Sequence, residues 1–285
     1  MTTPLPGPLV STEWLAEHLS DPDLKILDCT WHHESTNLDG RTQYRGRHLP
    51  GAVHFDIDHV ADKATSLPHM LPSAADFAKK VGLLGIGDGD RVVVYDRNCG
   101  GSAAARVWWM FRVFGYEAVA VLDGGYGKWV AEKRPTEMSP VRPEPKTFTA
   151  TFSPALVRTL DQMRGNITSG AEQVLDARGP AKFDGSQPDV FPVRKNGHIP
   201  NAINVPWGDL IVPDSGAFIP QEAIAARFAA AGIDLQRPIV VTCASGTISC
   251  VLALGLHLIG CATAAVYDGS WAEWGQAEDT PAAAA

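Results

Sequence analysis

Cysteine is scarce in this sequence, and the few cysteines present do not form a recognisable set. The 285 residues contain five, and no two of them form a Cys-x-x-Cys pair. A sparse, odd number suits a reducing compartment, and no Cys/His spacing typical of zinc sites occurs. We therefore expect no disulfide framework, no metal and no cofactor. The cysteines are Cys29, Cys99, Cys243, Cys250 and Cys261.

Long apolar runs and an excess of positive charge are missing as well. No run is long enough to span a bilayer, and the first 15 residues lack the basic start and apolar core of a signal peptide. The formal net charge of −8 argues against nucleic acids and anionic membranes as partners. It does not exclude a small anionic substrate, which would meet a local field. The sequence predicts a cytoplasmic protein.

The chain does contain an internal repeat of long period. From His48 to His198 the offset is 150 residues, and from Trp129 to Trp274 it is 145. Such a period indicates a duplicated domain rather than a solenoid. We expect domains over residues 1–134 and 155–285, joined by a proline-rich linker over 135–154. The matching segments are 25–29 and 173–177, 48–53 and 198–203, 91–96 and 238–243, and 121–129 and 266–274.

Short apolar strands alternate with helical patterns in each half, which is typical of a parallel α/β sheet. Ser73, with Asp76 three residues later, predicts the start of one helix. A second helix is expected to open at residues 153–154, where proline would take the first helical position. Ile224 and Phe228 should form the apolar face of a third helix.

Cys243 lies where an expected buried strand, residues 239–241, is followed by a tight loop and an apolar helix. Unpaired N–H groups and the helix dipole favour an anion there, so we expect a lowered thiol pKa and an exposed, reactive sulfur. A buried structural cysteine is the alternative. Small residues would let successive amides form an anion nest. The loop comprises Ala244, Ser245, Gly246, Thr247, Ile248 and Ser249.

The two halves differ at this position. Asp96 stands where the second half has Cys243, and the loop after Asp96 is about two residues longer. Cys99 is offset from the strand end, and we expect it to be inert. The second half would therefore carry the nucleophile, while the first half would supply structure and part of a cleft.

Together these motifs resemble those of the tandem-rhodanese sulfurtransferases. The resemblance rests on the HLPGA and HIPNA segments, the paired LDGG and YDGS segments with their following tryptophans, and the loop headed by Cys243. It extends from Ser11 to about Trp274. It implies an α/β fold of two tandem rhodanese-like domains, each a parallel five-stranded sheet flanked by helices. The CASGTIS segment is similar to the Cys-Gly-Ser-Gly-Val-Thr loop of 3-mercaptopyruvate sulfurtransferases, whereas thiosulfate-using rhodaneses carry basic residues directly after the cysteine.

The resemblance also implies a proton relay. Segments 55–58 and 68–72 look like those that supply an aspartate and a histidine beside the loop serine, here Asp58, His69 and Ser245. Histidine can move a proton near neutral pH, and a carboxylate can fix its tautomer. Taken without the resemblance, Asp58 would be a solvated loop carboxylate, His69 a turn residue and Ser245 a residue that bends the loop.

The residues expected to hold a substrate carboxylate depart from the family pattern. That pattern has Asp-x-Arg, then Arg-Phe, then a second arginine nine residues later. Here Arg178 is present, but Lys182 and Phe191 stand at the two later arginine positions. Lysine keeps the charge and loses the bidentate fork. We expect Arg178, Lys182 and Arg194 to bind the substrate, with Arg194 replacing the missing arginine.

The resemblance implies sulfur transfer from 3-mercaptopyruvate, through a persulfide on Cys243, to a thiol acceptor such as thioredoxin or to cyanide. A thiosulfate sulfurtransferase of the same architecture is one alternative, which the neutral Ala244 and Ser245 disfavour. A non-catalytic rhodanese-like binding module is another, which an intact Cys243 disfavours. Cysteine phosphatases and arsenate reductases share the strand–loop–helix unit, but those phosphatases need an arginine where this chain has Ser249.

Overall fold

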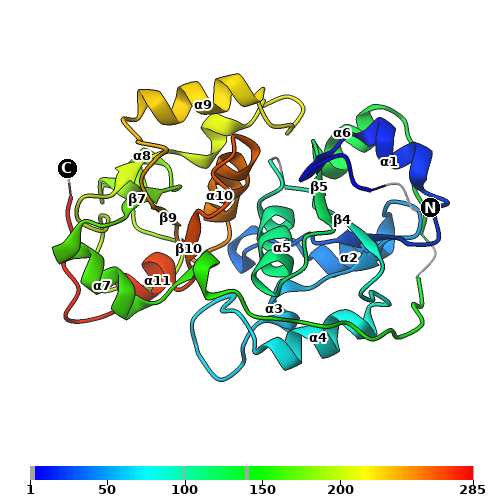
Figure 1. Ribbon diagram of the computed structural model, residues 1–285, viewed down its shortest axis with the longest axis horizontal. Helices are drawn as coiled ribbons and strands as arrows, with labels where there is room; N and C mark the ends of the chain where they lie inside the picture. The colour runs from blue at the N-terminus through cyan, green and yellow to red at the C-terminus, as the bar shows by residue number, and fades with distance from the viewer. Residues whose placement is uncertain (1–3, 99, 139–140, 285) are drawn as a thin grey trace. The chain divides into compact units, whose positions relative to one another are not determined.

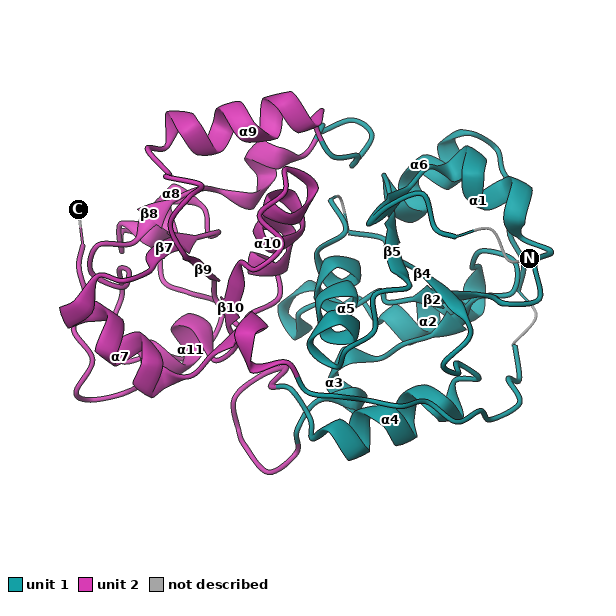
Figure 2. Cartoon of the chain, viewed as in Figure 1, with its two compact units in different colours: residues 1–62, 71–152, 212–218 teal, residues 63–70, 153–211, 219–285 magenta. Residues whose placement is uncertain are grey.

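The computed structural model describes residues 4–98, 100–138 and 141–284, which form two compact units (Figures 1 and 2). Unit 1 comprises residues 1–62, 71–152 and 212–218, and unit 2 comprises 63–70, 153–211 and 219–285. The main division falls at the end of the expected linker. Two short segments differ from the expected domains. Residues 63–70, from the first half of the sequence, belong to unit 2, and residues 212–218, from the second half, belong to unit 1.

Unit 1 is built on a parallel sheet of five strands in the order β1-β5-β4-β2-β3. The central strand β4 (Arg91–Tyr95) is buried throughout and pairs with β2 (Leu24–Asp28) and β5 (Val119–Leu122). The edge strands β1 (Leu9–Val10) and β3 (Val53–His54) are short, which limits the unpaired edge. The flanking helices are α1 (Thr12–His18), η1 (Glu34–Thr36), α2 (Gly40–Gly46), α3 (Ile57–Val60), α4 (Ala74–Leu83), α5 (Ser102–Val113) and α6 (Gly125–Ala131).

Unit 2 repeats this topology with the strand order β6-β10-β9-β7-β8, all parallel. Its strands are β6 (Val157–Arg158), β7 (Gln173–Asp176), β8 (Ile203–Asn204), β9 (Ile239–Thr242) and β10 (Ala265–Tyr267). The same order in both units confirms the predicted duplication and the predicted five-stranded sheets. Its helices are η2 (Pro154–Leu156), α7 (Leu160–Ser169), α8 (Pro180–Phe183), η3 (Trp207–Leu210), α9 (Gln221–Ala230), α10 (Ser249–Leu258) and α11 (Ser270–Trp274).

Two of the expected helix signals are confirmed. The Ser73 hydroxyl accepts the Asp76 N–H at 3.1 Å and caps α4. In α9, Ile224 and Phe228 form the buried face. The serine cap of α4 and the apolar face of α9 therefore lie where the sequence predicts them.

The prediction that a helix opens at residues 153–154 is wrong. Pro154 begins a single 3₁₀ turn that leads into β6, and the α-helix starts only at Leu160. Its N-cap is Thr159, whose hydroxyl accepts the Gln162 N–H while the Gln162 side chain accepts the Thr159 N–H. This capping box outweighs the proline, because it satisfies two donors at once.

The expected linker, residues 135–154, packs along unit 1 as far as residue 152. Phe148 is buried there against the rings of Phe77 and Phe111. The Lys146 ammonium lies 2.8 Å from each carboxylate oxygen of Asp90. Prolines keep this stretch out of regular structure, but an aromatic anchor and an ion pair make it part of unit 1 rather than a free tether.

Candidate active site

Cys243 directly follows β9, the central strand of unit 2, at the carboxyl end of the sheet. In open parallel sheets this edge is the usual place for ligands. The loop ends where α10 begins at Ser249, which confirms the predicted strand, loop and helix. The Cys243 carbonyl accepts the Trp271 N–H at 2.9 Å, and the Ala244 carbonyl accepts the Ala272 N–H at 2.8 Å. The first turn of α11 thus holds the start of the loop.

The expected exposure of the Cys243 thiol is wrong, because the residue exposes only 1% of its surface. Cys243 adjoins a strand that is buried along its whole length. Its N–H donates to the Ser270 hydroxyl at 3.2 Å, and its carbonyl is held by α11. Both backbone groups of Cys243 are therefore held by residues of unit 2. Reaction at this sulfur requires a small donor or a local opening.

Several polar groups of the loop have no partner within the described part of the chain. The hydroxyl oxygens of Thr247 and Ser249 are buried there without a hydrogen bond. The N–H groups of Ser245 and Thr247, both buried residues, likewise meet no acceptor among the described residues. Because buried polar groups are nearly always paired, such a loop is suited to a ligand that accepts several hydrogen bonds, such as an anion.

In unit 1 the residue at the position that matches Cys243 is an aspartate. Asp96 follows β4 as Cys243 follows β9. Its Oδ1 accepts the Asn98 N–H at 3.0 Å, and its Oδ2 accepts the Ala104 N–H at 2.8 Å. Burial raises the pKa of Asp96 to about 7, against the opposing effect of these N–H groups. The donors that an external anion would need are thus occupied. Cys99, expected to be inert, lies outside the described residues.

His69 and Asp58 belong to different units. His69 is buried in unit 2 with a left-handed φ of 60°, and its ring meets Phe191 edge to face with 6.2 Å between centroids. Asp58, in α3 of unit 1, accepts a hydrogen bond from the Trp31 indole at 2.6 Å. The relay of Asp58, His69 and Ser245 stays a prediction. The ring of Phe191, read in the sequence only as a lost arginine, forms an apolar wall beside His69.

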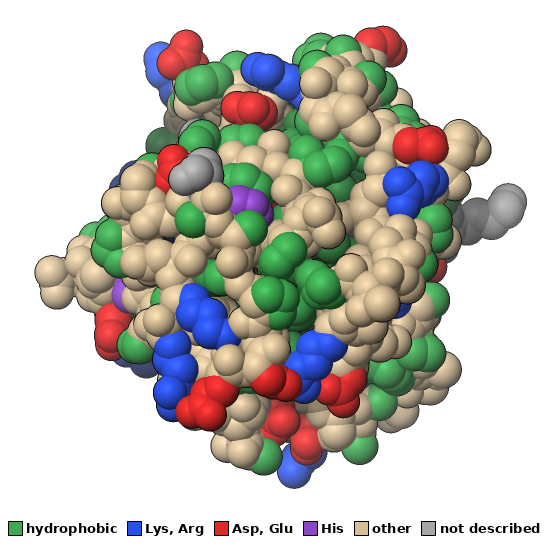
Figure 3. All heavy atoms as spheres, turned by 90° about the vertical axis from the view of Figure 1, so that its left-hand side faces the viewer, with side chains coloured by type: hydrophobic (Ala, Val, Ile, Leu, Met, Phe, Trp, Pro, Cys, Tyr) green, Lys and Arg blue, Asp and Glu red, His purple; other side chains and the backbone are tan. Residues whose placement is uncertain are grey.

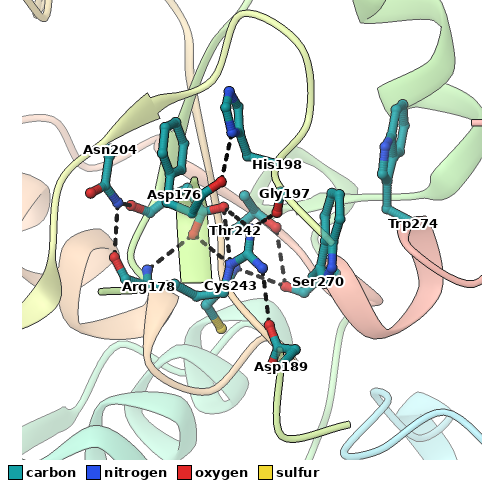
Figure 4. A network of polar contacts seen from close by, with 12 residues as sticks. Asp176, Arg178, Asp189, Gly197, His198, Asn204, Thr242, Cys243, Ser270 and Trp274 are labelled. Carbon is teal, nitrogen blue, oxygen red and sulfur yellow. Dashed lines mark hydrogen bonds and ion pairs between the residues drawn. The ribbon is translucent and has the colours of Figure 1, made fainter. Parts of the chain in front are cut away.

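Arg178 is buried, and its guanidinium is engaged on every side within unit 2 (Figure 4). It donates to both carboxylate oxygens of Asp176, to Asp189 at 2.9 Å and to the Gly197 carbonyl at 2.9 Å. It also lies over the Trp271 ring. Burial acts to lower its pKa, but the carboxylates outweigh burial and raise it. These contacts do not fit the expected role in substrate binding, since Asp176 at the end of β7 already requires this cation.

Lys182 and Arg194 have different surroundings. Lys182 is half-buried in α8, and its ammonium forms no ion pair with the residues that the structure describes. Arg194 is exposed and pairs with Glu278 at 3.1 Å, which is typical of a surface ion pair and does not fit a second substrate contact. The neighbouring Lys195 ammonium is bound to the Ala277 carbonyl at 2.6 Å. Of these four cations, Arg178 included, Lys182 is the one whose charged group meets no acceptor in the part of the chain that the structure describes.

The structure also bears on metals, membranes and surface charge. No three His, Cys, Asp or Glu side chains among the described residues are grouped so that they could hold a metal ion. Within the same residues, no helix is long and apolar enough to cross a bilayer. On the face shown in Figure 3, basic and acidic side chains lie next to one another, so this face presents no field of a single sign.

Both halves of the chain match the rhodanese-like domain family, over residues 11–132 and 159–277. Thiosulfate/3-mercaptopyruvate sulfurtransferase 1, mitochondrial, of Arabidopsis thaliana is 40% identical over 96% of this chain and 77% of the relative. The thiosulfate sulfurtransferase of Bos taurus is 42% identical, and the 3-mercaptopyruvate sulfurtransferase of Homo sapiens is 39% identical. Each of these two matches covers 93% of this chain and 91% of the relative.

A solved structure gives the same result. SseA from Escherichia coli, a 3-mercaptopyruvate sulfotransferase with the rhodanese fold, aligns with a TM-score of 0.85 and 33% identity. The alignment covers 93% of this chain and 99% of SseA. The repeated topology, the paired matches and these relatives agree, and the chain belongs to the rhodanese family as a member with two tandem rhodanese-like domains.

Proposed function

We propose that this protein is a sulfurtransferase that carries sulfur as a persulfide on Cys243, with 3-mercaptopyruvate as the donor. The contrast between the two loops carries this proposal. In unit 1 the Asp96 carboxylate occupies the N–H groups of its loop, whereas in unit 2 the donors of Ser245 and Thr247 meet no acceptor in the described chain. A persulfide anion is a ligand of the kind that such donors stabilise.

The chemistry is a nucleophilic displacement in two steps. The Cys243 thiolate attacks the donor sulfur, an S–S bond forms, and the C–S bond of the donor breaks. The electrons of that bond leave with pyruvate enolate, which then takes a proton. His69, with Asp58 and Ser245, is the proposed route for that proton. A thiol acceptor next attacks the outer sulfur and releases Cys243 as thiolate.

Thiosulfate is the second candidate donor. In that case the S–S bond of thiosulfate breaks and sulfite leaves. The neutral Ala244 and Ser245 favour 3-mercaptopyruvate, because the thiosulfate-using rhodaneses carry basic residues there. The engaged guanidinium of Arg178 and the apolar ring of Phe191 do not distinguish the two donors, since both donors are anions and either would have to use Lys182. Relatives of both names are similar to this chain at nearly equal identity.

The proposed acceptor is a thiol, such as that of reduced thioredoxin, and the proposed location is the cytoplasm. Both rest on sequence features alone. The Arabidopsis relative is named as mitochondrial, so the location needs a direct test. A fluorescent fusion of the full chain that accumulates in an organelle would contradict the cytoplasmic assignment.

Intact-mass measurement tests the sulfur carrier. After treatment with either donor, the protein should gain about 32 Da on the peptide that holds Cys243. Cys243→Ser should lose both the adduct and turnover. Cys261→Ser is the matched control and should keep both, because Cys261 lies half-buried between α10 and β10, where its thiol donates to the Leu235 carbonyl at 3.7 Å. An adduct on another cysteine would overturn the assignment, and parallel rates with the two donors decide between them.

A further inference from the structure

Ser270 adopts a backbone conformation that serine rarely adopts. It is the first residue of α11, it is completely buried, and its φ is 49°. This is the left-handed region, in which a side chain costs energy and glycine costs none. The matching residue of unit 1 is Gly125, the first residue of α6, with a φ of 53°. The chain thus keeps a strained side chain in the unit that carries Cys243.

The two positions contact their loops through the same backbone bond. In unit 1 the Tyr126 N–H donates to the Asp96 carbonyl at 3.0 Å, and in unit 2 the Trp271 N–H donates to the Cys243 carbonyl at 2.9 Å. A Cβ atom added to Gly125 would lie 2.7 Å from the Asp96 carbonyl oxygen. The shared geometry therefore favours glycine, and the serine at position 270 needs a reason.

The Ser270 hydroxyl supplies that reason, because it joins three points around Cys243 (Figure 4). It donates to the Tyr267 carbonyl at 2.8 Å and accepts the Cys243 N–H at 3.2 Å. The Thr242 hydroxyl lies 3.3 Å away and donates to it as well. These bonds fix the peptide plane between Thr242 and Cys243, and the direction in which the Cys243 side chain leaves the backbone depends on that plane.

We infer that Ser270 is a positioning residue for the sulfur of Cys243. By holding the Cys243 N–H, its hydroxyl keeps the sulfur aligned with the N–H groups of Ser245 and Thr247, which meet no acceptor in the described chain. Small errors in such alignment lower reaction rates strongly, and backbone strain is tolerated where a site requires it. The inference rests on the proposed function, since it is the persulfide chemistry of Cys243 that Ser270 positions.

Ser270→Gly tests this inference, because it removes the hydroxyl and installs the residue that unit 1 has at Gly125. Its melting temperature should exceed that of Ser270→Ala, since both variants lose the hydrogen bonds of the hydroxyl and only glycine accepts a φ of 49° without strain. We expect kcat for sulfur transfer to fall by about tenfold or more while KM changes by less than about twofold. Alkylation of Cys243 by iodoacetamide at fixed pH should slow in parallel. Ser270→Ala should lose the same kcat but melt at a lower temperature.

Asn201→Gly is the matched control. Asn201 is an exposed residue of unit 2 with a φ of 64°, and the matching residue of unit 1 is Gly51. The control relieves the same kind of strain away from Cys243 and should leave kcat unchanged. Wild-type kcat in Ser270→Gly would overturn the inference. So would a kcat loss that appears only at temperatures where part of the variant protein is unfolded. A wild-type protein that gains no sulfur on Cys243 from either donor would instead overturn the proposed function.

Discussion

Asp96→Asn should change how the stability of this protein depends on pH. Burial raises the pKa of Asp96 in the folded state from its ordinary value of 3.8 to about 7. Between these values the folded protein binds more protons than the unfolded chain, so the free energy of unfolding decreases as pH rises. At about 1.4 kcal/mol per pKa unit, the loss from pH 4 to pH 8 is of the order of 4 kcal/mol. Asparagine does not ionise and removes this loss.

The substitution has a second, pH-independent effect. Asp96 accepts N–H groups from both Asn98 and Ala104, and an asparagine oxygen in the same place would serve only one of them well. Leaving a buried donor unpaired costs about 1–3 kcal/mol. At pH 5 the wild type has lost only about 1.6 kcal/mol, so the two effects largely cancel. At pH 8 the avoided loss exceeds the cost, and the variant should be more stable than the wild type by about 1–3 kcal/mol. The slope against pH, rather than the stability at one pH, identifies the buried carboxylate.

Urea unfolding of the full chain from pH 5 to pH 8 measures this slope. The difference in unfolding free energy between variant and wild type, plotted against pH, cancels the contributions of other titrating groups. Asp28 is the exception, because its charge contributes to the raised pKa of Asp96. An Asp28→Asn background therefore serves as the control. Because the chain has two units, the unfolding transition assigned to unit 1 is the relevant one. Parallel curves for variant and wild type across this pH range would refute the reasoning.

Three further predictions concern the proposed site. His69→Ala and Asp58→Asn should each slow turnover by about one to four decades in steady-state assays, and wild-type rates in both would exclude the proposed proton relay. Lys182→Met should raise KM, because about 1.5–3 kcal/mol of binding free energy is lost with the charged contact. Arg194→Ala should leave KM unchanged, because Arg194 forms a surface ion pair. The opposite pattern would place the carboxylate site at Arg194. Arg178→Met should destabilise unit 2 by about 3–5 kcal/mol in denaturant unfolding, and a stable variant that binds donor poorly would restore Arg178 to the substrate site.

The sequence predicts the fold and the position of Cys243 well, because local patterns determine both. The β-branched run at 239–241 is buried on both faces of β9, and the small residues after Cys243 form the loop that leads into α10. The exchange of segments 63–70 and 212–218 between the units has no local signature. It follows from tertiary packing, which a single sequence does not report.

The roles of individual site residues were harder to predict. An Asp-x-Arg motif looks the same whether the arginine binds a substrate or an internal carboxylate, and Asp189, eleven residues from Arg178, decides between the two. Ser270 was missed although a signal existed. The LDGG segment has glycine where the YDGS segment has serine, and a position that is glycine in one half of a duplication is a candidate for left-handed backbone in both.

The two units differ in how far the polar groups of their loops are satisfied. Unit 1 pairs the N–H groups of its loop with Asp96 and keeps glycine at the left-handed position. Unit 2 leaves the hydroxyls of Thr247 and Ser249 buried without a partner in the described chain and strains Ser270. Each unpaired buried group costs about 1–3 kcal/mol, and an anion that supplies the missing acceptors returns that energy as binding. The unpaired buried groups of this loop and the anion affinity proposed for it therefore have one physical origin.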